Sequence, residues 1–279
     1  MRTSEKVKKS LVTCSMLIPI FAMLFPLYML LNNSFKTLRA MTLNALAPAI
    51  PPTLNNYIIV LDRVEYLRRI LNNFIIVIPS LTLIILLGAM AGFVVARRRS
   101  RVTKFIHTYI ILGIALPSVV MIYPQIRLIH SLGLMNNYLG MILIFVGSGI
   151  SMSLFMFNGF FGGAPKELEE SAKIDGASFY TTFFKIYFPL STPTAATVIL
   201  IQSIGIWNDE QLSNLLMAKT EQRMLLTSLQ EFYGAMVGRG IRWEQIYTYA
   251  AMCILPMIVM FFIVNRYLIS GISEGALKG

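Results

Sequence analysis

Long apolar runs constrain this sequence more than any other feature, because each is long enough to cross a lipid bilayer as a helix. A spanning helix needs about 20 mostly apolar residues, and its backbone polar groups pair within the segment, where no water reaches them. Hydrophobic residues make up 56% of the 279 positions and charged residues 13%, whereas soluble domains carry about 25% charged residues. The sequence therefore predicts an all-α polytopic membrane protein, with six transmembrane helices at residues 11–31, 71–96, 105–126, 138–161, 186–207 and 246–268.

The first apolar run follows a basic N-terminus, as it would in a secretory signal peptide. The run covers residues 11–31, which is longer than a signal h-region of about 7–15 residues, and no small-residue cleavage site follows it. We therefore expect it to be the first span, and we expect residues 1–279 to form a single transmembrane domain.

The placement of Lys and Arg predicts the orientation in the membrane. The second span ends in a compact basic turn that runs from Arg97 to Lys104, and the first ten residues carry further Lys and Arg side chains. Short basic segments of this kind stay in the cytoplasm. Both termini and residues 162–185 are thus predicted to be cytoplasmic. The same asymmetry accounts for the net charge of +11 without a nucleic-acid partner.

Two long loops, residues 32–70 and 208–245, then lie on the outer side. Two interpretations stay open for both loops. They are either solvated connectors or surfaces on which an external partner docks.

The sequence contains no pattern that would supply catalysis or energy. It has no GxxxxGK[ST] phosphate loop, no recurring Ser, His and Asp set, and no His and Cys cluster with metal-ligand spacing. Cys14 and Cys253 both lie in apolar runs and are interpreted as packing residues. No ionisable residue lies near the middle of a predicted span, which disfavours a proton-coupled carrier. We therefore expect a protein that is not an enzyme, holds no metal and has no energy source of its own.

One polar segment, from Pro165 to Pro193, separates two apolar runs. Pro165 suits the first position of a helix that carries glutamates in its first turns and reaches about Ile174. Asp175-Gly176 predicts a turn, and a second helix begins near Ser178. That helix has an aromatic face at helical spacing, formed by Phe179, Phe183, Phe184 and Tyr187. The face either lies among lipid headgroups or inserts into a groove on a soluble partner.

The segment resembles the EAA loop of binding-protein-dependent ABC importer permeases. The matching residues are Glu170-Ser171-Ala172, Gly176 and Ile186-Tyr187-Phe188-Pro189. Ser171 replaces the first alanine of that motif, and Phe188 replaces the leucine before proline. Other resemblances follow in the family's order along the chain: Asn72-Asn73, Gly92 to Arg97, Leu132 to Asn137, Trp207-Asn208-Asp209, Leu255-Pro256 and Ser270 to Gly279. The chain is most similar to the smaller permease subunit of maltose-type and multiple-sugar transporters.

This resemblance implies a permease subunit in a bacterial cytoplasmic membrane. It implies as partners a sister permease, a cytoplasmic ABC ATPase dimer that binds ATP and Mg, and an extracytoplasmic solute-binding protein. The EAA loop, about residues 165–189, would dock on the ATPase as a coupling helix. The residues implied in coupling are Glu170, Ser171, Ala172, Asp175, Gly176 and Ala177.

The residues that suit a solute path are neutral polar and aromatic side chains at plausible depth, because sugars bind through stacking and hydrogen bonds. Interhelical hydrogen bonding and interface packing are equally good interpretations of the same residues. The candidates are Tyr123, Asn158, Gln202, Ser203, Trp207 and Asn208.

Two other functions remain open beside a sugar importer. An importer of glycerol phosphate esters would share the architecture, and a self-contained channel or carrier would need no ATPase.

Gly88 and Gly92, a GxxxG pair, favour close helix packing within the subunit over dimerisation.

Overall fold

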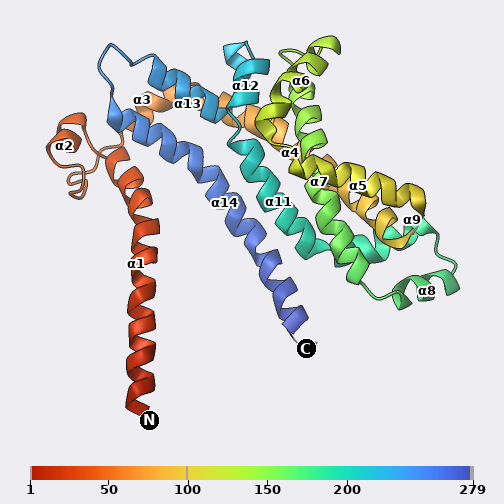
Figure 1. The fold of residues 1–279 in the computed structure, drawn as a ribbon. Coiled ribbons are helices and arrows are strands. Elements are labelled where there is room, and N and C mark those ends of the chain that lie inside the picture. The colour runs from red at the N-terminus through yellow and green to blue at the C-terminus, as the bar shows by residue number, and fades with distance from the viewer. Residues whose placement is uncertain (1, 99, 277–279) are drawn as a thin grey trace. The chain divides into compact units, whose positions relative to one another are not determined.

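The computed structural model describes the backbone of residues 2–98 and 100–276, and the side chains of residues 15–98 and 100–267. Within those ranges every regular element is helical, which confirms the predicted all-α fold (Figure 1). Cys14 lies outside the described side chains. The helices are α1 (Arg2–Ser34), α2 (Leu38–Leu43), α3 (Asn55–Arg63), α4 (Tyr66–Arg97), α5 (Arg101–Ala115), α6 (Ser118–Ser131), α7 (Tyr138–Gly163), α8 (Glu167–Ile174), α9 (Phe179–Thr182), η1 (Phe183–Tyr187), α10 (Phe188–Leu190), α11 (Thr192–Trp207), α12 (Gln211–Leu216), η2 (Thr220–Gln222), α13 (Leu225–Gly234) and α14 (Trp243–Ala276).

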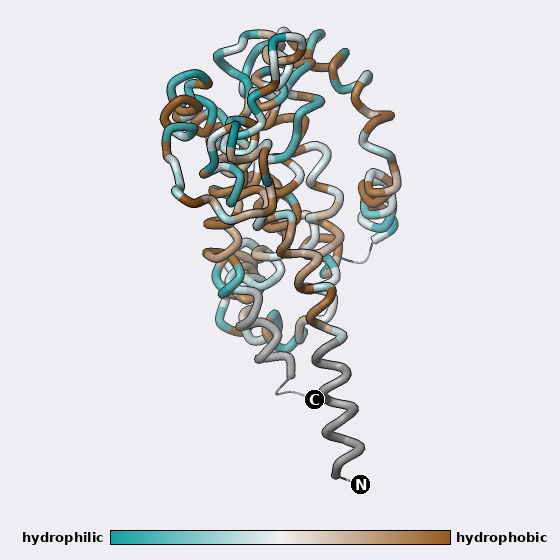
Figure 2. The backbone as a smooth tube through the Cα atoms, turned by 90° about the vertical axis from the view of Figure 1, so that its left-hand side faces the viewer, coloured by the Kyte–Doolittle hydropathy of each residue, from teal (hydrophilic) through white to brown (hydrophobic). Residues whose placement is uncertain are grey.

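Four helices of the described chain are long and apolar enough to span a membrane: Ser15–Ser34 within α1, then α4, α7, and Trp243–Tyr267 within α14. Two bent pairs, α5 with α6 and the α9–α10 segment with α11, bring the number to six if each pair is one span. Hydrophobic residues run along the long helices, and hydrophilic residues gather mainly in the connecting segments (Figure 2).

The predicted third span, residues 105–126, is not one helix. The chain bends by 110° between α5 and α6. Pro117 causes the break, because a residue before proline is driven out of the helical region. Leu116 accordingly has extended angles, with φ −80° and ψ 122°.

The fifth span also differs from residues 186–207. Its longer helix, α11, begins at Thr192, after a bend of 71° from the Phe179–Leu190 segment. Pro193 at the start of α11 has no backbone N–H to continue the preceding helix.

The chain divides into two compact units, which are described separately. The first contains Met1–Leu67 and Ser228–Pro256, and the second contains Arg68–Thr227 and Met257–Gly279.

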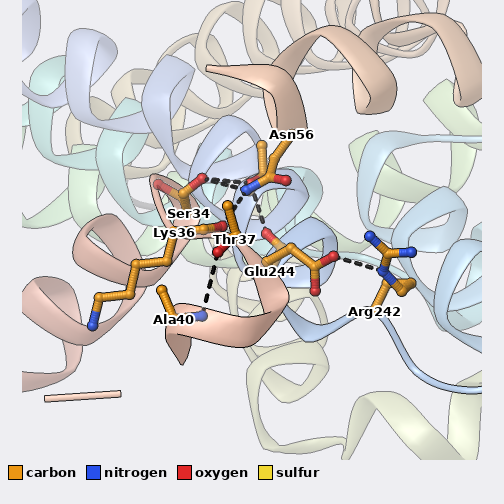
Figure 3. A network of polar contacts seen from close by, with 8 residues as sticks. Ser34, Lys36, Thr37, Ala40, Asn56, Arg242 and Glu244 are labelled. Carbon is orange, nitrogen blue, oxygen red and sulfur yellow. Dashed lines mark hydrogen bonds and ion pairs between the residues drawn. The ribbon is translucent and has the colours of Figure 1, made fainter. Parts of the chain in front are cut away.

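The first unit contains a buried polar network around residues 34–56 (Figure 3). The carbonyl of Ser34 accepts hydrogen bonds from Asn56 Nδ2 at 3.0 Å and from Thr248 Oγ1 at 3.0 Å. Asn56 Nδ2 also donates to the carbonyl of Lys36 at 2.7 Å. Glu244, 1% exposed, accepts from Arg242 Nε at 2.7 Å. Residues 34–56, within the predicted outer loop, are therefore held by buried hydrogen bonds.

Lys36 belongs to the same network and is itself buried. Its Nζ donates to the carbonyls of Asn44 and Ala45 at 3.0 and 2.9 Å. Burial lowers the pKa of this amine, because removal from water penalises the charged form.

The second unit is built around α7, against which α5 and α11 both pack. Helix α4 also approaches α7 closely at Gly92, where an added Cβ would lie 2.9 Å from the backbone nitrogen of Asn158. Ser153 of α7 donates a hydrogen bond to the carbonyl of Ile84 at 2.9 Å. The GxxxG pair thus serves helix packing within this chain, as expected.

Asparagines in the second unit hold residues 216–225 in place. Asn72 Nδ2 donates to the carbonyls of Glu221 and Arg223 at 2.8 and 3.0 Å. Asn73 Oδ1 accepts from the backbone N–H of Leu225 at 2.8 Å. Asn136, at φ +55°, accepts from the N–H of Ala218 at 2.7 Å. Residues that the sequence offered only as family matches therefore have a structural role.

Candidate functional site

The predicted coupling segment begins with α8, which carries three glutamates in its first turn and Lys173 in its last. This charge order complements the helix dipole. Glu169 Oε1 also pairs with Lys173 Nζ at 2.9 Å across one turn. The prediction that Pro165 occupies the first helical position is wrong, because the helix begins at Glu167 and its N-cap is Lys166.

The turn after α8 is closed by two backbone hydrogen bonds. Ala177 N–H donates to the carbonyl of Ala172 at 2.8 Å, and Gly176 N–H donates to that of Lys173 at 3.0 Å. This pattern is a Schellman motif, which needs a residue in the left-handed region. Gly176 has φ +73°. The predicted Asp175-Gly176 turn is confirmed.

The second helix of the segment starts at Phe179 with Ser178 as its N-cap, and Ser178 Oγ accepts from Thr181 N–H at 3.1 Å. A π-helical turn, Phe183–Tyr187, follows it. Phe184 in this turn is 47% exposed, and its ring contacts that of Phe183 with centroids 4.8 Å apart.

The remaining aromatic residues of this face pack inside the chain. Phe93 of α4, 1% exposed, lies at the centre of an aromatic cluster. Its ring centroid is 5.0 Å from that of Phe179, 5.3 Å from Phe183 and 5.0 Å from Tyr187. Phe161 of α7 completes the cluster at 5.5 Å from Phe93. The face therefore meets α4 and α7 of its own subunit, an outcome that neither interpretation of the sequence included.

Arg97, the last residue of α4, also holds the coupling segment. Its side chain is 6% exposed and lies 3.9 Å from Glu169 Oε2. The guanidinium donates to the carbonyl of Ala164 at 3.0 Å and lies 4.6 Å over the ring of Tyr187. Tyr187 in turn donates its hydroxyl to the carbonyl of Pro165 at 2.9 Å. In the sequence, Arg97 served to predict orientation and ended one of the family resemblances, and its contacts with this segment were not predicted.

The predicted coupling residues divide by exposure. Ala172 is 4% exposed and packs within the chain, while Ala177 is half-buried. Other residues of the segment are exposed, and Ile174 and Tyr180 add apolar area to its surface at 85% and 65% exposure. The exposed predicted residues are Glu170, Ser171, Asp175 and Gly176.

The structure does not bring the solute-path candidates together. Three of them make hydrogen bonds within the helix bundle: Asn158 with His107 Nε2 at 3.2 Å, Gln202 with the carbonyl of Gly149 at 3.3 Å, and Ser203 with that of Leu200 at 3.1 Å.

The other three candidates differ in exposure. Trp207 is buried and packs edge-on against Phe74 at 5.7 Å. Tyr123 is 72% exposed, and Asn208 is exposed where α11 ends.

Asp209 is a titratable group that the site prediction did not include. Burial raises its pKa to about 6, while a hydrogen bond from the N–H of Ser213 at 3.1 Å acts in the opposite direction. Among the residues with described side chains, no three His, Cys, Asp or Glu side chains form a metal-binding group.

Known proteins are similar to this chain in sequence and in fold. Residues 84–274 match the family described as "Binding-protein-dependent transport system inner membrane component". The chain is 29% identical to the melibiose/raffinose/stachyose import permease protein MelC of Bacillus subtilis (strain 168), over 100% of both chains. It is 28% identical to the multiple sugar-binding transport system permease protein MsmG of Streptococcus mutans serotype c, over 91% of this chain and 92% of the relative.

A solved structure has the same fold. It is a bacterial ABC transporter involved in the import of the acidic polysaccharide alginate, and one of its chains superposes with a TM-score of 0.80. The alignment covers 95% of this chain and 97% of the other at 20% identity. The predicted resemblance is confirmed at the level of the family. The chain is a multi-pass membrane permease that belongs to the binding-protein-dependent transport system inner membrane components.

Proposed function

We propose that this chain is the permease subunit of an ATP-driven ABC importer and forms half of the path for a sugar or oligosaccharide. The relatives' names refer to import of melibiose, raffinose and stachyose and to multiple sugars. These names favour a carbohydrate over a glycerol phosphate ester. Membership of a binding-protein-dependent family favours an importer over a self-contained channel.

The observation that carries the coupling role is the packing of the segment against two spans. A partner that moves α8 also moves the ends of α4 and α7, because the aromatic cluster and Arg97 link all three elements. The exposed side chains of Glu170, Ser171 and Asp175 remain free to meet that partner. ATP and Mg would be bound by a separate ATPase dimer, and closure of the dimer would move the segment.

The other proposed partners follow from the same family. A sister permease would supply the second half of the path, and a solute-binding protein would deliver the sugar on the outer side. Tyr233 and Trp243, whose ring centroids lie 6.1 Å apart, are candidate contacts for it. This arrangement puts both termini and α8 in the cytoplasm, in accordance with the basic turn after α4.

A matched pair of glycine variants tests the coupling role. Gly176 and Gly133 have φ +73° and +69°, and an added Cβ would meet no atom within 4 Å at either position. A β-branched residue costs about 1–3 kcal/mol at such a backbone conformation. Gly176→Val should abolish uptake and lower the amount of ATPase that co-purifies with the full chain, and Gly133→Val should retain both.

The substrate is tested in the native host with the chain deleted and then restored. Accumulation of radiolabelled raffinose should be lost on deletion and recovered on complementation. Recovery of sn-glycerol 3-phosphate uptake instead would contradict the carbohydrate assignment. Uptake by Gly176→Val at the wild-type rate and membrane level would contradict the coupling role.

A further inference from the structure

A hollow of about 620 Å³ lies where α4 ends and α5 begins, beside the last turns of α7. Four of its lining residues, Arg98, Arg101, Lys104 and His107, carry basic side chains. No acidic residue is among the lining residues. The hollow therefore favours an anion.

The cations of this hollow are not neutralised by the described part of the chain. Arg101 and Lys104 are exposed and make no ion pair with a described carboxylate. Arg98 lies over the ring of Phe179 at 4.8 Å, which leaves its charge uncompensated. The N-terminus of α5, which begins at Arg101, adds the partial positive charge of the helix dipole.

Two glycines of α7 leave the hollow unfilled. Gly159 and Gly162 both line it, and a Cβ added to either would meet no atom within 4 Å. A side chain added at either position would therefore begin in open space at the wall of the hollow. The hollow is thus left open because these two positions carry no side chain.

The location of the hollow identifies the anion. It lies at the end of the membrane-spanning helix α4, and α5 leads away from it with an exposed apolar face. Val102, Phe105 and Tyr109 on that face are 66%, 71% and 71% exposed, and the rings of Phe105 and Tyr109 stack with centroids 6.4 Å apart. A free phosphate would use only the cations, whereas a phospholipid would also cover the apolar face with its acyl chains.

We propose that this hollow binds the phosphate headgroup of an anionic phospholipid of the cytoplasmic leaflet. Basic pockets between membrane helices on this side bind such headgroups in other proteins. One solute-path candidate, Asn158, also lines the hollow, and the proposal rests on the cytoplasmic orientation proposed above but not on the identity of the solute. Because Arg98 also contacts Phe179, the bound lipid would adjoin the coupling segment.

Native mass spectrometry of the purified full chain in detergent tests the proposal. The chain is titrated with dioleoylphosphatidylglycerol and, separately, with dioleoylphosphatidylcholine. We expect the anionic lipid to bind at least about tenfold more tightly. Arg101→Gln combined with Lys104→Gln should weaken that binding about thirtyfold. Arg39→Gln combined with Arg63→Gln, two exposed residues of the first unit, removes the same charge and should leave the affinity within about threefold.

A space-filling variant separates the hollow from surface charge. Gly162→Leu keeps every cation, its Cβ meets no atom within 4 Å, and it should lower the affinity for the anionic lipid at least about tenfold. Equal binding of the two lipids, or equal weakening by the two charge variants, would overturn the proposal. So would displacement of the lipid by millimolar inorganic phosphate, which would assign the hollow to free phosphate.

Discussion

Phe93 should control how firmly the coupling segment is held, and Phe93→Leu tests this. Leucine retains most of the apolar volume, so the variant loses mainly the ring geometry. Four ring centroids lie 5.0–5.5 Å from that of Phe93. Each aromatic pair contributes about 0.5–1.5 kcal/mol beyond burial. These terms share one ring and are not additive, so we expect a loss of about 2 kcal/mol.

Hydrogen–deuterium exchange of residues 167–190 measures that loss. A cost of about 2 kcal/mol raises the population of the open segment about thirtyfold, and amide exchange should accelerate by the same factor. Phe155→Leu is the matched control, because Phe155 lies on α7 at 51% exposure, away from the cluster. Unchanged exchange in Phe93→Leu, or equal acceleration in both variants, would refute the argument that the cluster holds the segment.

Three further substitutions test the second unit. Burial raises the pKa of Asp209 to about 6 from 3.8, so the folded chain binds this proton more tightly than the unfolded chain and loses stability as pH rises between those values. The thermal midpoint of Asp209→Asn should therefore rise relative to that of wild type between pH 4 and pH 7. A constant difference between the two midpoints would contradict the raised pKa. Asn73→Ala leaves the N–H of Leu225 unpaired, which should cost about 1–3 kcal/mol and accelerate exchange in residues 217–227, whereas unchanged exchange would show that this bond is dispensable. Gly92→Leu should sharply lower the yield of folded chain in detergent because α4 and α7 cannot separate locally, while Gly147→Leu, in open space, should not; equal yields would argue against that packing.

Hydrophobicity and turn-forming glycine predict much of this fold. The apolar runs located α1, α4, α7 and α14, because a membrane helix needs little more than length and apolar character. The turn at Gly176 could also be predicted from the sequence, since few residues other than glycine tolerate its backbone angles.

The bends within the third and fifth predicted spans were harder to predict from the sequence. Pro117 and Pro193 were visible, yet proline either kinks a membrane helix or ends it, and the neighbouring helices decide which. The sequence therefore predicted continuous spans where the structure has bends of 110° and 71°.

The site could be predicted only in part, for a related reason. Periodicity identified the aromatic face of the segment but not its partner, because Phe93 and Phe161 lie in runs where almost every residue is apolar. Arg97 was used to predict orientation and as the end of a family motif, and neither use predicts that its side chain reaches the carbonyl of Ala164. Contacts between segments distant in sequence leave no periodic signal within either one.

The contacts of Arg97 suit the proposed coupling role, in which an exposed helix would transmit movement to buried spans. A helix pair held only by apolar contacts could rotate about its own axis when a partner pulled it. Arg97 restricts that rotation, because it contacts the carbonyl of Ala164 before α8, Glu169 within it and the ring of Tyr187 after it. Because these three contacts come from different parts of the segment, we expect the segment and the end of α4 to move together. Arg97→Lys keeps the charge but not the planar fork that makes these contacts at once. In that variant we expect the chain to fold and the proposed ATPase to bind, with uptake reduced by at least about tenfold. Retention of wild-type uptake would mean that the aromatic cluster alone transmits the movement.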